Sequence, residues 1–225
     1  MKIIQPSYEI TMDISPFGTC ELMHVEQAAR ICYKSEDRIT DQGESAKKLI
    51  RNLIRNGHEA MLEHSFLSVK FVCDRGISHE LVRHRMASFA QESTRYCNYS
   101  NDKFGGEITV IKPCFLKEGT EPYQHWAIAM SEAEDWYFKL LDQGLTPQEA
   151  RCVLPNSLKT EIEVSANYRE WRHILDLRCD AAAHPQMREL MKPLLIELHE
   201  RIPVVFDDIY GKHIDGVGIQ EAVSA

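Results

Sequence analysis

Apolar side chains recur every three or four residues in several stretches of the chain, which is the period of an amphipathic helix. Residues with strong local preferences are expected to mark helix ends: Gly57 as a stop, Ser78 as an N-cap, and Thr146 with Pro147 as an N-cap and first helical residue. The predicted helices cover residues 21–33, 45–56, 79–86, 121–142, 168–179 and 186–201, with a further one starting after Thr146.

Other stretches alternate apolar and polar residues with a period of two, which indicates strands. The predicted strands cover residues 66–73, 107–112 and 159–165, and a first strand starts within residues 1–13. Residues 97–106 are rich in Asn, Ser, Asp and Gly and are expected to form a loop. Because the strands do not alternate regularly with the helices, the pattern favours a mixed chain over a doubly wound parallel sheet.

Composition narrows the class of protein. The 225 residues are 44% hydrophobic and 27% charged, which is typical of a globular chain able to form a core. The formal charge of -8 argues against non-specific binding to nucleic acids or anionic membranes. No stretch approaches the roughly 18 apolar residues of a membrane span, and the first residues do not resemble a signal peptide. A cytoplasmic protein is therefore expected.

The cysteines and histidines do not form a metal-binding pattern. The seven cysteines include no C-x-x-C pair, so neither a zinc knuckle nor a thioredoxin-type motif is indicated. On a helix, His58 and His64 would be separated by about 600° of rotation, and His79 and His84 by about 140°, so neither pair would share a face. No metal site is predicted.

Residues 83–95 concentrate positive charge and hydrogen-bond donors in an acidic chain. They read Arg-His-Arg-Met-Ala-Ser-Phe-Ala-Gln-Glu-Ser-Thr-Arg. Guanidinium groups bind anionic oxygens in a planar, bidentate way. Apolar neighbours suggest that the run is partly buried, and a buried arginine needs an anionic partner. On a helix over 79–86, Arg83 and Arg85 would point about 200° apart, towards two ligands or two subunits.

Each basic cluster also has a simpler interpretation. The run at 83–85 could be a solvated face or a nucleic-acid patch. Arg151, in an apolar helix that ends before Pro155, could form a core ion pair or contact a ligand. Arg169 and His173 are spaced i,i+4, as on the basic face of an ordinary amphipathic helix.

Taken together, the clusters resemble the flavin-dependent thymidylate synthase family over residues 50–100 and 147–190. The most specific motif is Arg-His-Arg, seven residues and then Ser93, followed by Arg95 and Tyr96. The weaker landmarks are Gly-His-Glu to Glu-His at 57–64, Ala-Arg-x-x-Leu-Pro at 150–155, and Asn-x-Arg to Leu-Arg at 167–178.

The resemblance implies an α+β fold, with residues 1–225 forming a single mixed domain in which a small, largely antiparallel sheet is flanked by several helices. It implies a homotetramer with sites shared between subunits. The implied reaction is the reductive methylation of dUMP to dTMP. The carbon donor is 5,10-methylenetetrahydrofolate, and FAD reduced by NADPH is the hydride donor. The implied mechanism has no protein nucleophile, and Cys97, the cysteine nearest to the motif, is expected to be a bystander.

The resemblance also carries site residues over to this chain, with Arg178 as the catalytic residue facing the uracil ring. Ala60 is among the residues that match flavin-contacting positions, although an alanine can contribute only backbone and van der Waals contacts. The residues matching flavin-contacting positions are Ala60, Arg83, His84, Arg85, Gln91, Asn167, Tyr168, Arg169 and His173. Those matching dUMP-contacting positions are Glu80, Leu81, Val82, Arg83, Gln91, Glu92, Ser93, Thr94, Arg95, Arg151 and Arg178.

Departures from the family pattern keep alternatives open. Ala90 and Gln91 stand where many members have Asn and Glu, and Glu80 stands where Gln is expected. Because a carboxylate beside a phosphate dianion is unfavourable, Glu80 is expected to point to the pyrimidine or sugar. These changes leave room for a nucleotide-binding regulatory protein that retains the dUMP pocket without catalysis. An RNA-binding module is a third hypothesis, disfavoured by the charge of -8.

Overall fold

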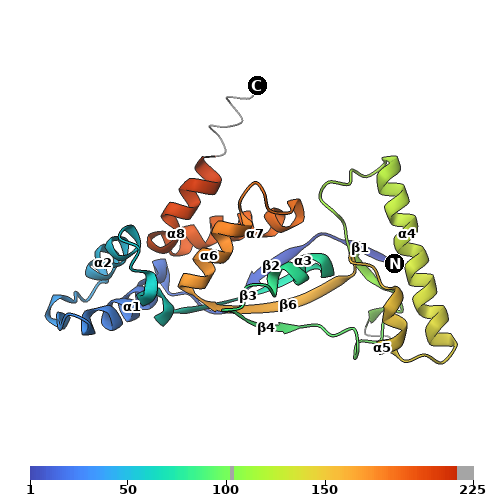
Figure 1. Ribbon diagram of the computed structural model, residues 1–225, viewed down its shortest axis with the longest axis horizontal. Helices are drawn as coiled ribbons and strands as arrows, with labels where there is room; N and C mark the ends of the chain where they lie inside the picture. The colour runs from blue at the N-terminus through green and yellow to red at the C-terminus, as the bar shows by residue number, and fades with distance from the viewer. Residues whose placement is uncertain (102–103, 217–225) are drawn as a thin grey trace, which may run out of the picture. The chain divides into compact units, whose positions relative to one another are not determined.

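The computed structural model describes residues 1–101 and 104–216, and Figure 1 shows their arrangement into helices and strands. The helices are α1 (Thr19–Ile31), α2 (Glu44–Arg55), α3 (Arg75–Leu81), α4 (Glu121–Asp142), α5 (Pro147–Ala150), α6 (Tyr168–Arg178), α7 (Pro185–Arg201) and α8 (Pro203–Tyr210). The strands are β1 (Lys2–Ile4), β2 (Ser7–Ile10), β3 (Phe66–Asp74), β4 (Ser88–Gln91), β5 (Thr109–Ile111) and β6 (Lys159–Asn167).

Contacts between Cα atoms divide the chain into two compact units that interleave in the sequence. Unit 1 comprises Met1–Glu9, Lys70–Arg83 and Phe89–Val164. Unit 2 comprises Ile10–Val69, His84–Ser88 and the described part of Ser165–Ala225. The division falls within strands β2, β3, β4 and β6, so the single domain over 1–225 stays a prediction.

Four strands form one sheet in the order β2-β3-β6-β4. The Ser65 carbonyl at the start of β3 accepts a hydrogen bond from the Tyr168 amide after β6, and the Arg75 amide after β3 donates to the Leu158 carbonyl before β6. The start of β3 therefore pairs with the end of β6, which makes this pair antiparallel. Strands β1 and β5 form a separate two-stranded parallel sheet. The predicted mixture of several helices with a small antiparallel sheet is confirmed.

Most of the predicted helices and strands are present with ends shifted by a few residues. Gly57 follows α2 with a φ of 70°, a conformation that glycine adopts without steric cost, so its predicted role as a helix stop is confirmed. Thr146 caps α5 through a capping box with Glu149, also as predicted. Both Gly57 and Thr146 lie within four residues of the helix end that they specify.

The prediction of a helix over 79–86 capped by Ser78 is wrong. Helix α3 begins four residues earlier, because Asp74 ends β3 and its carboxylate accepts a hydrogen bond from the Ile77 amide at 2.9 Å. The helix ends at Leu81, so Arg83 and Arg85 follow it instead of lying on it. The inference that these two arginines point about 200° apart on a helix therefore fails.

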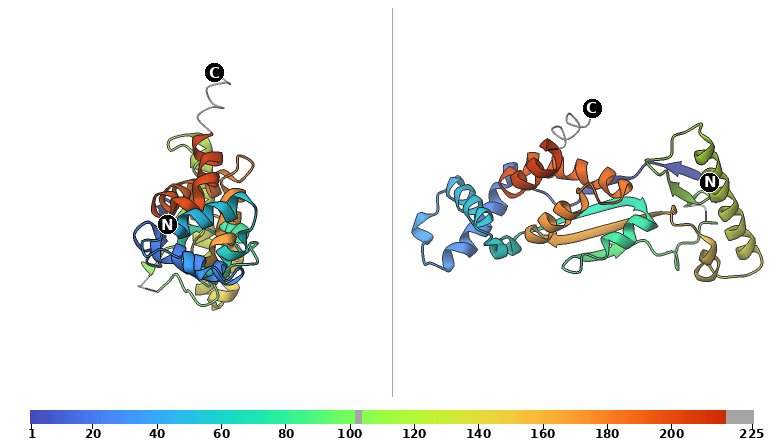
Figure 2. Two further views of the ribbon diagram at one scale, coloured as in Figure 1. Left: turned by 90° about the vertical axis from the view of Figure 1, so that its left-hand side faces the viewer. Right: turned by 45° about the horizontal axis from the view of Figure 1, so that its top comes forward.

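Strand β4 and helix α8 were not predicted. Strand β4 has only four residues and lies within residues 83–95. Its alternation of apolar and polar residues is too short to be recognised in the sequence. Helix α8 has eight residues and starts at Pro203, directly after the end of α7. Within unit 2, α6, α7 and α8 pack against one another, as Figures 1 and 2 show. Among the described residues, no helix combines the length and apolar character that crossing a membrane requires.

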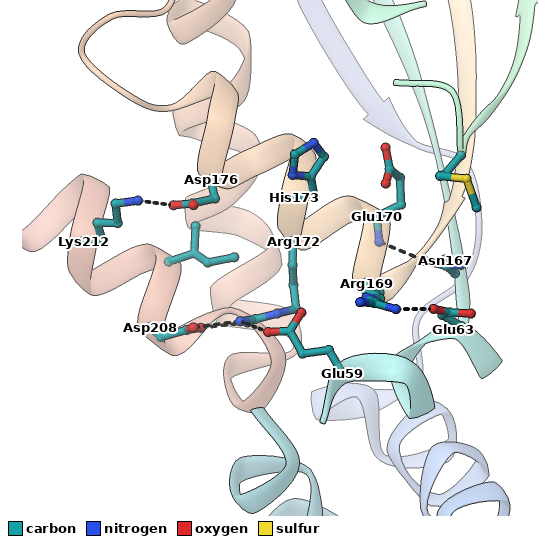
Figure 3. Close-up of a pocket in the computed structure, with 12 residues that line it drawn as sticks. Glu59, Glu63, Asn167, Arg169, Glu170, Arg172, His173, Asp176, Asp208 and Lys212 are labelled. Carbon is teal, nitrogen blue, oxygen red and sulfur yellow. Dashed lines mark hydrogen bonds and ion pairs between the residues drawn. The ribbon is translucent and has the colours of Figure 1, made fainter. Parts of the chain in front are cut away.

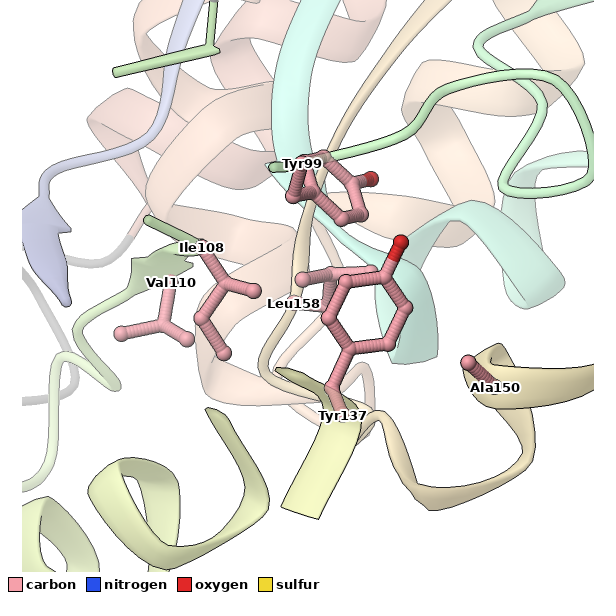
Figure 4. Close-up of a cluster of buried hydrophobic side chains, with 6 residues drawn as sticks. All are labelled: Tyr99, Ile108, Val110, Tyr137, Ala150 and Leu158. Carbon is pink, nitrogen blue, oxygen red and sulfur yellow. The ribbon is translucent and has the colours of Figure 1, made fainter. Parts of the chain in front are cut away.

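Each unit has its own buried side chains. In unit 1, Tyr99 and Tyr137 lie with their ring centroids 5.7 Å apart in a cluster completed by Ile108, Val110, Ala150 and Leu158 (Figure 4). Cys97 packs against this cluster, and its role as a bystander stays a prediction.

Unit 2 contains an ion pair between two of its helices, in which the arginine is buried and the aspartate is half-exposed. The guanidinium of Arg172 on α6 meets the carboxylate of Asp208 on α8 through two contacts of 2.7 Å. One of its nitrogens, Nη2, also lies 3.2 Å from the Glu59 carboxylate. Burial raises the pKa of Asp208, but the hydrogen bonds and charge of Arg172 outweigh it and lower that pKa below its ordinary value. The pair therefore stabilises the packing of α6 on α8.

Replacing Asp208 with Asn should lower the free energy of unfolding by about 1–2 kcal/mol, because a charged partner of a buried guanidinium is lost from a half-exposed position. Asp207→Asn is the matched control, since Asp207 pairs with His199 on the surface and should change stability by less than about 0.5 kcal/mol. Urea unfolding followed by circular dichroism measures both.

The dependence of this effect on pH follows from the lowered pKa of Asp208. The ion pair contributes fully above the ordinary aspartate pKa of about 3.9, and its contribution is lost as the pH falls through the lower folded-state pKa. The difference between Asp208→Asn and the unmodified protein should therefore shrink below about pH 4. Equal stability of the two proteins at pH 7 would contradict this account of the packing.

Candidate functional site

The Arg-His-Arg run lies in a turn between α3 and β4. The Arg83 amide donates to the Glu80 carbonyl, and the Ala87 amide donates to the His84 carbonyl at 3.0 Å. The side chains of Arg83 and Arg85 are exposed, and within the described residues neither takes part in a hydrogen bond or ion pair. The run is therefore partly buried, as the sequence suggested, but the turn directs only the histidine inwards and leaves both arginines exposed.

His84 is the buried member of the run, with only 4% of its surface exposed. Its Nε2 accepts a hydrogen bond of 3.0 Å from Nε of Arg178, the last residue of α6. Burial, reinforced by the nearby charges of Arg178 and His173, lowers the pKa of His84 to about 4. Two residues from different family landmarks, His84 and Arg178, are thus in direct contact within unit 2.

A cavity of about 590 Å³ in unit 2 brings together three of the residues carried over for flavin binding: Asn167, Arg169 and His173 (Figure 3). Asn167 caps α6, because its side chain accepts from the Glu170 amide at 2.9 Å. Arg169 forms an exposed ion pair of 2.6 Å with Glu63. The cap orients the first turn of α6, so that residues 169 and 173 both line the cavity.

The same cavity contains charged residues that sequence reasoning missed. Arg172 pairs with Asp208, and Lys212 pairs with Asp176 at 2.7 Å (Figure 3). Arg172 stands three residues after Arg169, so a search for charged residues one helical turn apart would have found it. Asp208 and Lys212 follow the recognised motifs by 30 residues or more, and the sequence offers no local signal for them.

Other residues carried over for flavin binding lie elsewhere. The ring of Tyr168 is fully buried and packs edge-on against Phe206, and burial raises the pKa of its phenol. Its side chain is therefore a core residue. Ala60 lines a different, more apolar pocket of unit 2, which also includes His58 and Arg38.

In unit 1, Thr94 and Arg151, which were both carried over for dUMP binding, form a polar pair. The Arg151 guanidinium donates to the Thr94 hydroxyl at 3.1 Å, and both line a cavity of about 420 Å³. Arg75 and His79, which sequence reasoning missed, line the same cavity. Arg151 is exposed and forms no ion pair among the described residues, so of its two interpretations the ligand contact is favoured over the core ion pair.

Gln91 and Glu92 have internal partners within unit 1. The Gln91 side-chain amide donates to the hydroxyls of Ser78 and Thr160 at 2.8 and 3.2 Å. The Glu92 carboxylate accepts from Lys159 at 3.0 Å. These contacts fix the end of β4, and the loop containing Ser93 follows directly from it.

The remaining predicted substrate residues differ in exposure. Leu81 is buried, so only its backbone is available, whereas Glu80 is partly exposed and Val82 is exposed. The Ser93 hydroxyl accepts from the Arg95 amide at 3.3 Å. Arg95 is exposed and lies over the Tyr96 ring, 5.5 Å from its centroid.

No group of three or more metal-ligating side chains occurs among the residues that the structure describes. The buried thiols are also poorly suited to catalysis. Burial raises the pKa of both Cys73 and Cys179 to about 12, so both stay protonated at neutral pH.

Comparison with known proteins identifies the family. A sequence model described as "Thymidylate synthase complementing protein" matches residues 21–204. The flavin-dependent thymidylate synthase of Corynebacterium aurimucosum is 34% identical over 202 residues, covering 83% of this chain and 79% of the relative. That of Pyrococcus furiosus is 32% identical over 169 residues, covering 75% of this chain and 68% of the relative.

A solved structure has the same fold. It is the UMP/dUMP methylase PolB of Streptomyces cacaoi bound with 5-Br dUMP, which superposes with a TM-score of 0.74 and 24% identity. The match covers 94% of this chain and 97% of the other. Because both the family model and relatives above 30% identity extend over most of the sequence, the chain belongs to the family of flavin-dependent thymidylate synthases.

Proposed function

We propose that this protein is a flavin-dependent thymidylate synthase that converts dUMP to dTMP, with 5,10-methylenetetrahydrofolate as carbon donor and NADPH as reductant. The observation that carries the proposal is the 34% identity to a synthase of that name over 83% of the chain. A homotetramer, implied by the resemblance alone, and a cytoplasmic location, expected from the sequence, are part of the proposal.

The residues present fit FAD in type. The cofactor contains a pyrophosphate, and Arg83 and Arg85 offer exposed guanidinium groups without a partner among the described residues. Among the described residues, the Arg169 side chain is held by one exposed ion pair, with Glu63. Such pairs contribute little stability, so exchanging it for a ligand phosphate costs little. His173 is exposed and lines the cavity of unit 2.

When bound, FAD reduced by NADPH would supply the hydride that completes the methyl group. The chain itself would hold the cofactor through the side chains of Arg83, Arg85, Arg169 and His173. Gln91, Tyr168 and Asn167, whose side chains have internal roles, would contribute backbone contacts.

The nucleotide phosphate would bind in unit 1. A dUMP phosphate carries close to two negative charges and needs several cationic or hydroxyl donors. Arg151 and Thr94 already meet at 3.1 Å, and Arg75 and His79 line the same cavity. Ser93 and Arg95, in the same loop as Thr94, would complete the donor set. Because the carboxylate of Glu92 pairs with Lys159, its negative charge is partly offset.

Arg178 would act on the pyrimidine ring of dUMP. Its permanent positive charge can stabilise the negative charge that develops on the ring as the new carbon–carbon bond forms. No protein thiolate is required in this mechanism, which is consistent with the raised pKa of the buried cysteines.

The proposal is tested by the absorbance spectrum of the purified protein and by product analysis. Flavin bands that bleach when NADPH is added without oxygen, followed by dTMP formation with dUMP and 5,10-methylenetetrahydrofolate, are the expected result. A colourless protein that still binds dUMP would instead support a regulatory nucleotide-binding protein.

Changing Arg178 to Ala should lower kcat by about a hundredfold or more, because the charge opposite the reacting ring is lost. The flavin content should stay unchanged, since Arg178 is not assigned to the flavin. Arg201→Ala is a matched control, because Arg201 forms a surface pair with Glu197 on α7. Unmodified turnover in Arg178→Ala would remove this residue from the mechanism.

Changing Ser93 to Ala should weaken dUMP binding by about 1–3 kcal/mol if its hydroxyl contacts the phosphate. Isothermal titration of the flavin-loaded protein measures this change. Ser100→Ala is the control, because the Ser100 hydroxyl donates locally to the Asn98 side chain. An unchanged dissociation constant for Ser93→Ala would exclude the hydroxyl from the phosphate site.

A further inference from the structure

Several of the proposed phosphate donors lie in residues 93–98 of unit 1, which we call the phosphate loop. The Glu92 amide, directly before the loop, donates to the Glu161 carbonyl on β6 at 2.9 Å. The chain then turns, and the Tyr96 amide donates to the Ser93 carbonyl at 3.1 Å. Because the loop has no regular secondary structure, its conformation depends on the contacts at its ends.

The carboxylate of Glu92 joins the two ends of the phosphate loop. Its Oε1 accepts a hydrogen bond of 3.4 Å from the hydroxyl of Tyr99, the residue directly after the loop, and its Oε2 accepts one of 3.0 Å from Lys159 at the start of β6. Tyr99 is only 5% exposed and belongs to the buried cluster shown in Figure 4. The end of the loop is therefore anchored in the core of unit 1, and Glu92 connects the beginning of the loop to that anchor.

Lys159 lies between two carboxylates. Its ammonium is 3.0 Å from Glu92 and 2.6 Å from Glu161, and its side chain is 20% exposed. Burial lowers the pKa of Lys159, but the hydrogen bonds and charges of Glu161 and Glu92 outweigh it and raise that pKa above its ordinary value. Lys159 is therefore charged at neutral pH, and its partly buried ion pairs are screened less by salt than exposed ones.

The contacts of Glu92 are made away from the proposed phosphate donors. Glu92, Lys159 and Tyr99 line a cavity of about 510 Å³, whereas Thr94 and Arg151 line the cavity of about 420 Å³ described above. The partners of the Glu92 carboxylate are thus found in a different cavity from the pair that would meet the phosphate. This arrangement favours a role for Glu92 in holding the loop over direct contact with the nucleotide.

A loop that is already held in its binding conformation binds a ligand more tightly than a mobile one. Each side chain that becomes ordered only on binding reduces the affinity, and contacts that order it beforehand avoid this loss. The hydroxyl and guanidinium groups of the phosphate loop are suited to a dianion only when they converge on one point, so their support decides how well they bind.

We propose that Lys159 is a positioning residue, which holds the Glu92 carboxylate and thereby keeps the phosphate loop ordered before dUMP binds. Tyr99 completes this support from the other end of the loop. The inference rests on the proposed function for the identity of the ligand, and it assigns the Glu92 side chain to the loop instead of to the nucleotide.

Substitutions on both sides of the ion pair test this role in the flavin-loaded protein. Lys159→Met removes the charge at similar length, Glu92→Leu removes the acceptor, and the double variant removes both. Lys159→Arg keeps a charged donor and is the conservative variant. Lys47→Met is the matched control, because it also removes one positive charge and breaks an ion pair, with Glu44 on α2.

Lys159→Met and Glu92→Leu should each weaken dUMP binding by about tenfold in isothermal titration, because the loop must then become ordered on binding. The double variant should be within about twofold of the weaker single variant, since both changes remove the same contact. Lys159→Arg and Lys47→Met should stay within about threefold of the unmodified protein. At saturating dUMP, kcat should change by less than about threefold in every variant, because the bound loop is the same.

The signs of the two single effects distinguish this role from its alternatives. If Lys159 acted only by screening the charge of Glu92 from the phosphate, Glu92→Leu would tighten dUMP binding. If Glu92 contacted the nucleotide directly, Glu92→Leu would weaken binding and Lys159→Met would leave it unchanged. Either result would overturn the proposal.

Hydrogen exchange measures the order of the loop without any ligand. The Tyr96 amide, which donates to the Ser93 carbonyl, should exchange at least about fivefold faster in Lys159→Met and in Glu92→Leu, while the amides of α6 keep their rates. If Lys159→Met does not fold, the exchange in Glu92→Leu decides.

Unchanged exchange of the Tyr96 amide in the folded variants would overturn the proposal, whether or not the protein makes dTMP. Failure of the unmodified, flavin-loaded protein to bind dUMP would instead refute the proposed nucleotide site. Because the exchange experiment needs no nucleotide, the two failures are distinguishable.

Discussion

The antiparallel pairing of β3 with β6 is the constraint on which the arrangement of the candidate site depends. Each strand ends in a capping residue that starts a helix directly: Asp74 begins α3 and Asn167 begins α6. The Arg-His-Arg turn follows α3, whereas α6 carries Arg169, His173 and Arg178 along its length. Backbone hydrogen bonds at both ends of the strand pair therefore fix where each helix begins. The register of one pair of strands thus determines the starting points of both segments that carry the chemistry.

The charges of the candidate site fall into two groups with different roles. Arg172 is buried and paired with Asp208, so its charge serves the packing of α6 on α8. Arg83 and Arg85 are exposed and have no partner among the described residues, so their charge is available to an anionic ligand. An acidic chain can bind anionic ligands in this way, because the field near a ligand depends on local unpaired charge more than on the net charge of -8.

The parts of the fold that could be predicted from sequence are those specified by nearby residues. Gly57 stops α2 and Thr146 caps α5, and each signal acts within a few residues. The start of α3 was misjudged because Asp74 and Ser78 are both good N-caps, and the choice depends on where β3 ends. The pairing of β3 with β6 sets that end, and residues more than 80 positions apart determine it. Sequence pattern alone does not contain this information.

The same distinction applies to the candidate site. The motif at 83–95 was recognisable because its residue types are unusual in an acidic chain, whereas Arg151 and Arg178 were carried over from the resemblance and their roles stay predictions. The contact between His84 and Arg178 could not be recognised from the sequence. It depends on the His84 side chain pointing inwards from its turn and on Arg178, at the end of α6, lying 94 residues later in the chain. A histidine between two arginines suggests a third cation for an anionic ligand. Once buried against Arg178, it becomes a neutral acceptor instead, because the adjacent positive charges oppose its protonation. The two flanking arginines and the histidine between them thus contribute opposite properties, charge and neutrality, from three consecutive positions.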